Sequence, residues 1–138
     1  MVKILIAICF VLATVAQASA NINSYDKYGQ KERTYRKTST GYSVYDKHGR
    51  KTGSYKEKSD GYGVYNEYGS KTGSYKKTST GYNIYDQYGR KTGSLKETQA
   101  GKINQYDQYG RKTGSYRKDS SGRVVQYDQY GRKVRSFK

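Results

Sequence analysis

The repeating unit of this chain is Tyr45-Asp46-Lys47-His48-Gly49-Arg50-Lys51-Thr52-Gly53-Ser54-Tyr55. Near-copies begin at Tyr25, Tyr65, Tyr85, Tyr106 and Tyr127, at intervals of 20 or 21 residues. A period of this length is typical of repeat architectures, in which each unit is one supersecondary element. The fold of the chain is therefore the fold of this unit, repeated about six times.

Each unit carries two turn signals. The first is Asp-x-x-Gly, as in Asp46 to Gly49, which fits a three-residue hairpin loop with a bulge. The second is a compact Gly turn such as Ser59-Asp60-Gly61. The segments between turns are short, rich in Tyr, Val and Thr, and show no helical period, so we expect two β-strands in each unit. The predicted fold is all-β: tandem antiparallel β-hairpin repeats that form a twisted or coiled meander sheet.

Counting outward from Gly61 predicts how the strands align. If Ser59-Asp60-Gly61 is a three-residue loop, Tyr55 lies opposite Tyr65. Opposite residues share a face of the sheet, so the same counting predicts one aromatic ladder across the array. Its expected members are Tyr25, Tyr35, Tyr45, Tyr55, Tyr65, Tyr75, Tyr85, Leu95, Tyr106, Tyr116, Tyr127 and Phe137.

Two further expectations concern irregular parts of the array. The connections from Gly101 to Tyr106 and from Gly122 to Tyr127 are one residue longer than the others, which predicts β-bulges there. An open sheet also has two edges. We expect the edge strands near Tyr25 and Phe137 to be protected by charge, notably by Lys133, Arg135 and Lys138.

The first 20 residues have a different composition. Lys3 precedes an apolar run from Ile4 to Val15, and Ala18-Ser19-Ala20 resembles a cleavage site. These features predict a secretory signal peptide over 1–20 and a repeat array over 21–138, with a secreted, extracellular or periplasmic location. The alternative is an uncleaved membrane anchor, for which the run is short. Cys9 is the only Cys, so cleavage would leave a chain without disulfides.

The charge balance points to acidic partners. Removal of Lys3 leaves 26 Lys and Arg against 11 Asp and Glu, a net charge of +15. A small domain needs a net charge of only about 2–8 for solubility. High charge with few aliphatic residues is typical of disorder, but the 18 Tyr and the regular turns favour a folded array.

Tyr-Asp-x-x-Gly-Arg followed by a Gly turn resembles the YD repeats of large bacterial surface and toxin proteins. Tyr85 to Arg90, Tyr106 to Arg111 and Tyr127 to Arg132 match best. The resemblance implies β-hairpins that wrap into a shell, and a link to carbohydrate binding. The chain departs from that pattern in the Lys after each Gly-Arg, where the family prefers an apolar residue. MORN-type hairpin repeats are a weaker analogy.

The repeated acids and the single His do not indicate catalysis. Asp26, Asp46, Asp86, Asp107 and Asp128 recur at one position, where Asn66 stands once. Cation binding is one reading, but Asn66 and the surrounding Lys and Arg favour a turn-forming role. His48 replaces a Tyr of the other units and has no partner for nucleophilic chemistry in its unit. We expect a protein that is not an enzyme and that uses no cofactor or metal.

The remaining candidates are basic and aromatic side chains at the Asp turns. They predict a non-enzymatic protein that binds anionic or carbohydrate surfaces: anionic polysaccharide, lipopolysaccharide or cell-wall polymer, or extracellular nucleic acid. The alternative is a Tyr-, Lys- and Gly-rich matrix or adhesive protein that self-associates through sheet edges. The candidate contacts are Lys47, His48, Arg50, Lys51, Tyr68, Lys71, Tyr88, Arg90, Lys91, Tyr109, Arg111, Lys112, Tyr130, Arg132 and Lys133.

Overall fold

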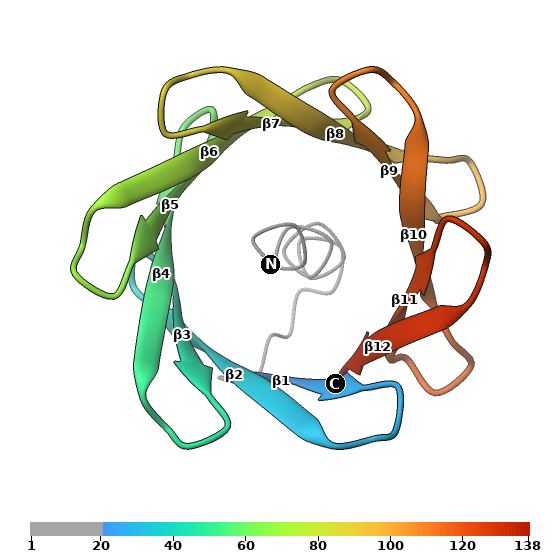
Figure 1. Cartoon of the computed structure of the whole chain (residues 1–138), viewed down its shortest axis with the longest axis horizontal. Helices are drawn as coiled ribbons and strands as arrows, with labels where there is room; N and C mark the ends of the chain where they lie inside the picture. The colour runs from blue at the N-terminus through green and yellow to red at the C-terminus, as the bar shows by residue number, and fades with distance from the viewer. Residues whose placement is uncertain (1–20) are drawn as a thin grey trace.

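The computed structural model describes residues 21–138, which form a closed barrel of antiparallel strands (Figure 1). The predicted signal peptide lies outside the described residues. Each strand pairs with the next in sequence, and the last pairs with the first. The strands are β1 (Asn21–Asp26), β2 (Lys31–Thr38), β3 (Gly41–Asp46), β4 (Lys51–Lys58), β5 (Gly61–Asn66), β6 (Lys71–Lys77), β7 (Gly81–Asp86), β8 (Lys91–Glu97), β9 (Ile103–Asp107), β10 (Lys112–Lys118), β11 (Val124–Asp128) and β12 (Lys133–Phe137). Among these residues there is no helix that could cross a membrane.

The all-β hairpin prediction is confirmed, and so is the structure of the Asp turn. In the second unit the amide of Gly49 donates to the carbonyl of Asp46 at 3.1 Å. The amide of Asp46 donates to the carbonyl of Arg50 at 2.9 Å, which closes a three-residue loop. Gly49 has a φ of +82°, a conformation that costs glycine little and other residues more.

The expectation of an open meander sheet is wrong, because the array closes on itself. All six Asp-turn hairpins contain a register shift at the same place, as between Val44 and Tyr45 in the β3–β4 pair. The pairs between successive units, such as β4–β5, contain none. A β-bulge bends its strand and increases the local twist. Six bulges at equivalent positions therefore curve the sheet evenly, which favours closure.

The predicted register is wrong by one residue. Ser59 and Asp60 alone form the loop between β4 and β5, because Lys58 pairs with Gly61. Tyr55 consequently lies opposite Val64, while Tyr65 lies opposite Ser54. Gly61 fits the tighter turn because it has a φ of +148° and any Cβ there would collide with the carbonyl of Tyr75.

The residues that were expected to form one aromatic ladder therefore form two rings of side chains, which lie on opposite faces of the barrel wall. The buried ring consists of Tyr35, Tyr55, Tyr75, Leu95, Tyr116 and Phe137. It shares its face with aliphatic residues that include Val44, Val64 and Ile84, and together they make the core. The second ring is half-buried and consists of Tyr25, Tyr45, Tyr65, Tyr85, Tyr106 and Tyr127. The barrel interior thus takes one Tyr or equivalent from every even-numbered strand.

The longer connections do not contain the predicted bulges. The β8–β9 and β10–β11 pairs have no register shift. The extra residue lies in the loop, which is wider than Ser59-Asp60. In the loop between β10 and β11, Asp119 N–H donates to the carbonyl of Arg123 at 2.8 Å and Gly122 N–H to the carbonyl of Asp119 at 3.1 Å. The loop between β8 and β9 does the same with Thr98, Gly101 and Lys102.

The two expected edge strands are paired with each other. Ser24, Tyr25 and Asp26 of β1 align with Phe137, Ser136 and Arg135 of β12. Two hydrogen bonds between the backbones of Asn23 and Lys138, of 2.8 and 2.9 Å, extend this pairing. Arg135, expected to protect an edge, instead forms an ion pair of 2.8 Å with Glu32 of β2, across β1. Asn21 and Lys138 lie at the end of the barrel opposite the Asp turns.

Candidate functional site

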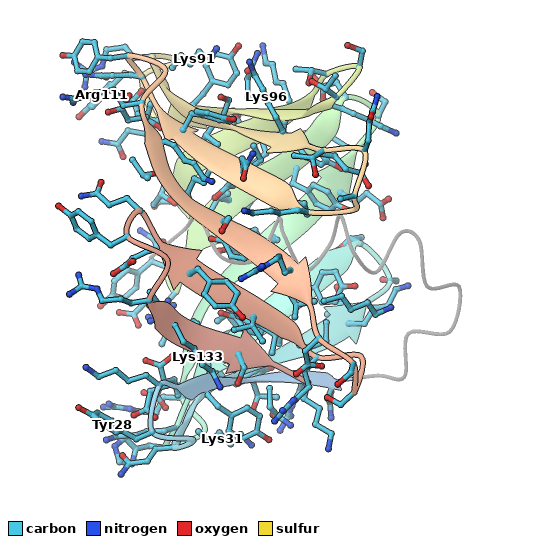
Figure 2. All side chains as sticks on the ribbon, turned by 90° about the vertical axis from the view of Figure 1, so that its right-hand side faces the viewer. Tyr28, Lys31, Lys91, Lys96, Arg111 and Lys133 are labelled. Atoms are coloured by element: carbon cyan, nitrogen blue, oxygen red, sulfur yellow. The ribbon has the colours of Figure 1, made fainter. Side chains whose placement is uncertain are left out.

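The six Asp-turn loops and the Lys that follows each of them lie together at one end of the barrel. We call this surface the Asp-turn rim; it comprises 26–31, 46–51, 66–71, 86–91, 107–112 and 128–133. Because every odd-numbered strand runs toward this end and every even-numbered strand away from it, the repeat brings all six loops to one rim. In Figure 2, Tyr28 and Arg111 project from this end, whereas Lys96 lies toward the other.

The Asp side chain organises each loop from within. In the fourth unit, Asp86 Oδ1 accepts hydrogen bonds from the amides of Tyr88 and Arg90, both at 2.9 Å. Asp86 Oδ2 accepts one from Arg90 Nε, also at 2.9 Å. The backbone hydrogen bond from Arg90 is the largest cause that lowers the pKa of Asp86. The turn-forming role predicted for the repeated Asp is thereby confirmed, and Asn66 accepts the same two backbone hydrogen bonds.

The same loop positions an arginine over an exposed tyrosine. The guanidinium carbon of Arg90 lies 5.2 Å from the ring centroid of Tyr88. The side chain of Arg90 is 74% exposed and Tyr88 is 73% exposed. Since the ion pair with Asp86 uses Nε, the two terminal nitrogens of Arg90 remain directed to solvent, where they could hold a planar anion.

Two neighbouring loops repeat this geometry. Arg111 lies 5.3 Å from the ring of Tyr109, and Arg132 lies 5.1 Å from the ring of Tyr130. Their Nε atoms are 2.8 Å from Asp107 and Asp128, respectively. We call the set Tyr88, Arg90, Tyr109, Arg111, Tyr130 and Arg132 the Arg–Tyr track. Equivalent loops are two strands apart, about 10 Å across the strands, so the track offers evenly spaced cations and aromatic faces.

The other three loops depart from this pattern. The loop 66–70 has Ser70 in place of Arg. The hydrogen bond that the Tyr68 hydroxyl donates to the Glu67 carboxylate raises the pKa of Tyr68. The first loop has Gln30 in place of Arg, although Lys27 lies 5.0 Å from the ring of Tyr28. The second loop keeps Arg50 but has His48 in place of Tyr. The rim is therefore not uniform, and its most regular part is the Arg–Tyr track.

All fifteen side chains predicted from the sequence as contacts are exposed, and all lie on the Asp-turn rim. One of them is turned away from the loop tips. Lys112 lies beside Lys102, and repulsion between the two ammonium groups is the largest cause that lowers the pKa of Lys102. Tyr28, which the prediction omitted, is exposed like its counterparts, and alignment of the units would have found it.

A second set of tyrosines and cations lies on the outer wall and was missed because of the register error. The half-buried Tyr65 is covered by Lys56 of the preceding strand, whose ammonium is 4.8 Å from the ring centroid. The same arrangement joins Arg36 to Tyr45, Lys76 to Tyr85, Lys96 to Tyr106 and Arg117 to Tyr127, at 4.4–5.5 Å. These rings face their own cations, so they offer less free aromatic surface than the rim does.

The opposite rim contains a further Asp loop that the sequence reading took for a compact Gly turn. Asp119 Oδ1 accepts hydrogen bonds from the amides of Ser121 and Arg123, and Oδ2 accepts one from Arg123 Nε at 3.1 Å. A hydrogen bond from the Ser121 side chain is the largest cause that lowers the pKa of Asp119 to about 2. The motif Asp119-x-x-Gly-Arg123 could have been found by searching outside the repeat register. This rim is also basic, but the exposed tyrosines of the described chain all belong to the Asp turns.

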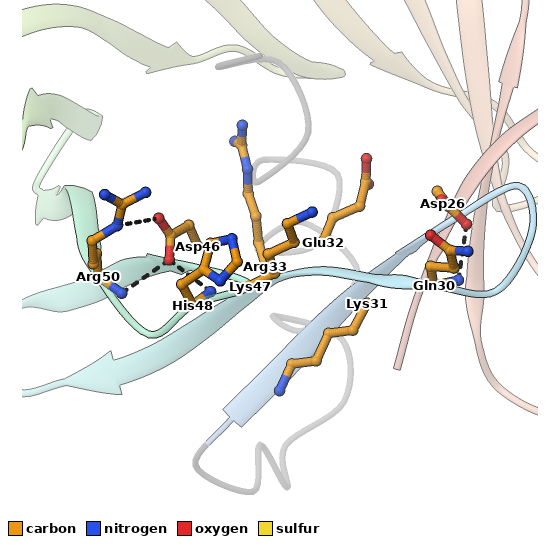
Figure 3. Close-up of a pocket in the computed structure, with 9 residues that line it drawn as sticks. All are labelled: Asp26, Gln30, Lys31, Glu32, Arg33, Asp46, Lys47, His48 and Arg50. Carbon is orange, nitrogen blue, oxygen red and sulfur yellow. Dashed lines mark hydrogen bonds and ion pairs between the residues drawn. The ribbon is translucent and has the colours of Figure 1, made fainter.

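One hollow of the rim lies between the first two hairpins (Figure 3). It has a volume of about 490 Å³, and its wall includes Gln30, Glu32, Arg33, Lys47 and His48. Figure 3 shows Glu32 and Arg33 pointing to the same side of β2, with Lys31 on the other. This departure from strand alternation is caused by the β-bulge. Arg33 pairs with Ser24 and Lys31 pairs with Tyr25, so Glu32 is the extra residue between them and has no partner in β1.

Residues 21–138 contain no group of three or more His, Cys, Asp and Glu that could hold a metal ion. Comparison of the chain with protein-family profiles, with curated proteins and with solved structures gave no match. The resemblance to YD repeats therefore remains a prediction from the residues of this chain.

Proposed function

We propose that the protein is a non-enzymatic binder of acidic polysaccharides, which it contacts through the Asp-turn rim. The observation that carries this proposal is the Arg–Tyr track. Three adjacent loops each present a solvent-directed guanidinium and an exposed ring at the same relative position. A guanidinium suits a carboxylate or sulfate group, and the ring offers an apolar face to the C–H side of a sugar.

The ring of loops supports a multivalent mode of binding. A polymer that engages one loop holds its next charged groups close to the neighbouring loops, so weak individual contacts add up to a higher affinity. The Asp–Arg ion pair within each loop of the Arg–Tyr track fixes the guanidinium before the ligand arrives. Binding therefore immobilises less of the Arg side chain than it would on a flexible surface.

Charge alone does not separate the two rims, because Lys58, Lys77, Lys118 and Arg123 make the opposite rim basic as well. The exposed rings do separate them. A purely electrostatic partner would use either rim, whereas a ligand that also needs aromatic stacking would prefer the Asp turns. This difference favours a polymer with ring faces, such as an acidic polysaccharide, over a bare anionic surface as the partner.

The test measures the affinity of an acidic polysaccharide, such as polygalacturonate or heparin, as a function of salt concentration. Replacing Tyr88, Tyr109 and Tyr130 together by Ser should weaken binding at least tenfold with no change in net charge. Replacing Arg90, Arg111 and Arg132 by Gln should weaken binding more than replacing Lys58, Lys77 and Lys118 by Gln, an equal charge change on the opposite rim. It should also reduce the slope of log K against log salt. Equal effects of the two triple charge changes, with no effect of the Tyr changes, would rule out the Asp-turn rim as the binding surface.

The alternative of a self-associating matrix protein needs a free strand edge. Among the described strands each has two neighbours, so edge-to-edge assembly would first require the β1–β12 pair to open. No observation on the Asp-turn rim favours that process, and we therefore propose the binding function alone.

A further inference from the structure

The 490 Å³ hollow of the rim lies between two hairpins whose loops depart from the Arg–Tyr track. Its wall includes Gln30 of the first loop, which stands where the track has Arg. It also includes His48 of the second loop, which stands where the track has Tyr. Figure 3 shows Asp26 and Gln30 on one side of the hollow and His48 and Arg50 on the other. The two substitutions therefore change the surface of one and the same hollow.

The presence of Gln30 leaves one carboxylate oxygen of Asp26 without a partner. Asp26 Oδ1 accepts hydrogen bonds from the amides of Tyr28 and Gln30, at 2.9 and 2.8 Å. In the Asp-turn loops that have Arg at the position of Gln30, the second Asp oxygen lies 2.8–3.1 Å from Arg Nε, as in the pair of Asp46 and Arg50. Among the described residues, Asp26 Oδ2 has no ion pair and no hydrogen bond of this kind. The half-buried Asp26 therefore offers a free acceptor in the wall of the hollow.

Other charged side chains of the wall are already engaged within the protein. Glu32 forms an ion pair of 2.8 Å with Arg135. Arg33 forms a hydrogen bond with the hydroxyl of Tyr35. Contacts to a ligand must therefore come from the remaining side chains of the wall.

These remaining side chains can both accept and donate hydrogen bonds. Asp26 Oδ2 accepts, the exposed amide of Gln30 does both, and the exposed ammonium of Lys47 donates. The imidazole of His48, also exposed, has one donor and one acceptor nitrogen when it is neutral. A sugar hydroxyl both donates and accepts, so it suits such a mixture. Two neighbouring hydroxyls of a sugar ring can bind Asp26 and Gln30 together.

The unpaired charge of Asp26 decides between a neutral and an acidic sugar. A carboxylate or sulfate group beside Asp26 Oδ2 would meet a like charge that no Arg of this loop compensates. An uncharged hydroxyl would instead donate a charge-assisted hydrogen bond to the same oxygen, which is stronger than one between neutral groups. Ligand pockets span about 300–1,000 Å³, and the hollow falls within that range. Its chemistry and size suit a neutral sugar unit.

Closure of the barrel places this hollow beyond one end of the Arg–Tyr track. The last loop of the track, 128–132, leads into β12, and β12 pairs with β1. The first loop follows β1 directly at Asp26. A polymer that lies along the track and extends past Arg132 therefore reaches the first loop and then the hollow.

We propose that this hollow binds a neutral hexose unit of the polymer. Two neighbouring hydroxyls of the hexose contact Asp26 Oδ2 and the Gln30 amide, and the other side of the ring is directed toward Lys47 and His48. This inference rests on the proposed function and deepens it. The track holds acidic units, and the hollow selects an uncharged unit next to them. The preferred ligand is then a mixed polysaccharide with acidic and neutral sugars.

The experiment titrates the protein as purified with the methyl glycosides of glucose, galactose and mannose, and separately with glucuronate and glucosamine. Backbone amides are followed by NMR. At least one neutral glycoside should shift the amides of Gln30, Lys47 and His48 and should bind at least fivefold more tightly than either charged sugar. No shift of these amides with any of the three glycosides would overturn the proposal. Tighter binding of glucuronate or glucosamine would overturn the selection of a neutral unit.

Two substitutions test the free oxygen of Asp26 directly. Gln30→Arg installs the residue of the track and should weaken binding of the neutral glycoside at least tenfold, because the new guanidinium would pair with Asp26 Oδ2. Asp26→Asn keeps the turn, as Asn66 does, but replaces the free acceptor by an NH₂ donor, and it should weaken binding at least fivefold. Ser70→Arg adds the same charge to the third loop and is the matched control, with unchanged glycoside affinity. Urea unfolding of each variant verifies that it is folded. Unchanged affinity in Gln30→Arg and Asp26→Asn, or an equal loss in Ser70→Arg, would overturn the proposal.

The same variants separate this inference from the proposed function. Gln30→Arg adds a cation to the rim, so its affinity for a long acidic polymer should stay the same or rise, while its affinity for the neutral glycoside falls. Glycoside binding without polymer binding would overturn the rim proposal alone. Polymer binding without glycoside shifts at Gln30 would overturn the hollow as a sugar site and leave the rim proposal standing.

Discussion

Replacement of Tyr75 by Ala tests the inward ring most sharply, because Tyr85 and Tyr88 provide matched controls in the adjoining hairpins. Tyr75 is 1% exposed, Tyr85 is half-buried on the outer wall under Lys76, and Tyr88 is 73% exposed. A buried aromatic covers about 150–250 Å², and its truncation to Ala costs about 3–5 kcal/mol. Tyr85→Ala loses part of that area and a cation–π contact, which we expect to cost about 1–2 kcal/mol. Tyr88→Ala should change stability by less than about 0.5 kcal/mol.

The assay is urea unfolding followed by circular dichroism. With an m-value of about 2 kcal/mol per M, the midpoint of Tyr75→Ala should fall by about 1.5–2.5 M. Tyr75→Phe removes only the hydroxyl and should lower the midpoint by well under half as much, since a net hydrogen bond contributes about 1 kcal/mol. If Tyr85→Ala destabilises as much as Tyr75→Ala, the two rings do not lie on opposite faces and the reasoning is refuted.

Four further predictions concern the turns, the acid range and the closure of the barrel. Asp86→Ala should lower the melting temperature by a few degrees in differential scanning calorimetry. Asp86→Asn keeps the Oδ1 acceptor, as Asn66 does, and should lower the melting temperature less. Equal decreases in the two variants would contradict the turn role of Asp86. The pKa of Asp119 is about 2 in the fold, against an ordinary value of 3.8. A lowered folded pKa contributes stability that is present above the unfolded pKa and is lost as the pH falls through the folded pKa. Unfolding midpoints should therefore decrease between about pH 4 and 2, and less so in Asp119→Asn; an identical pH dependence of that variant would contradict the assignment. A double-mutant cycle of Glu32→Gln and Arg135→Gln should give a coupling of about 0.5–1 kcal/mol from urea unfolding, and no coupling would place the two groups apart in solution. The double variant Tyr25→Cys and Ser136→Cys should form an intramolecular disulfide on mild oxidation, because these residues are paired. The control Tyr25→Cys and Ser74→Cys should form none. If the first pair fails to form a disulfide under conditions that preserve the fold, the barrel is open.

Local turn chemistry is the part of the fold that could be read from the sequence. The Asp turn was predicted correctly because one side chain, one glycine and the loop length all specify the same hairpin. The other turn was ambiguous, since Ser59-Asp60-Gly61 fits either a two-residue or a three-residue loop. A slip of one residue exchanges the two faces of a strand, so this single ambiguity placed Tyr55 and Tyr65 on the same face, whereas only Tyr55 lies on the buried face.

Closure of the barrel could not be read from any one unit. It depends on the summed bend of six bulges and on the alignment of β1 with β12, which are more than a hundred residues apart in the chain. The candidate contacts were easier, because residues next to an Asp turn are exposed whichever face of the strand is buried.

The most direct test of the central claim uses the loop glycines as reporters of the two rims. Amide resonances of glycines are well separated in NMR spectra, and each loop contains a glycine or is followed directly by one. On addition of an acidic oligosaccharide, we predict the largest shifts at Gly89, Gly110 and Gly131, within the loops of the Arg–Tyr track. Gly41, Gly61, Gly81, Gly101 and Gly122 on the opposite rim should remain nearly unchanged. Shifts of equal size on both rims, or confined to the second group, would contradict the assignment of the Asp-turn rim as the binding surface.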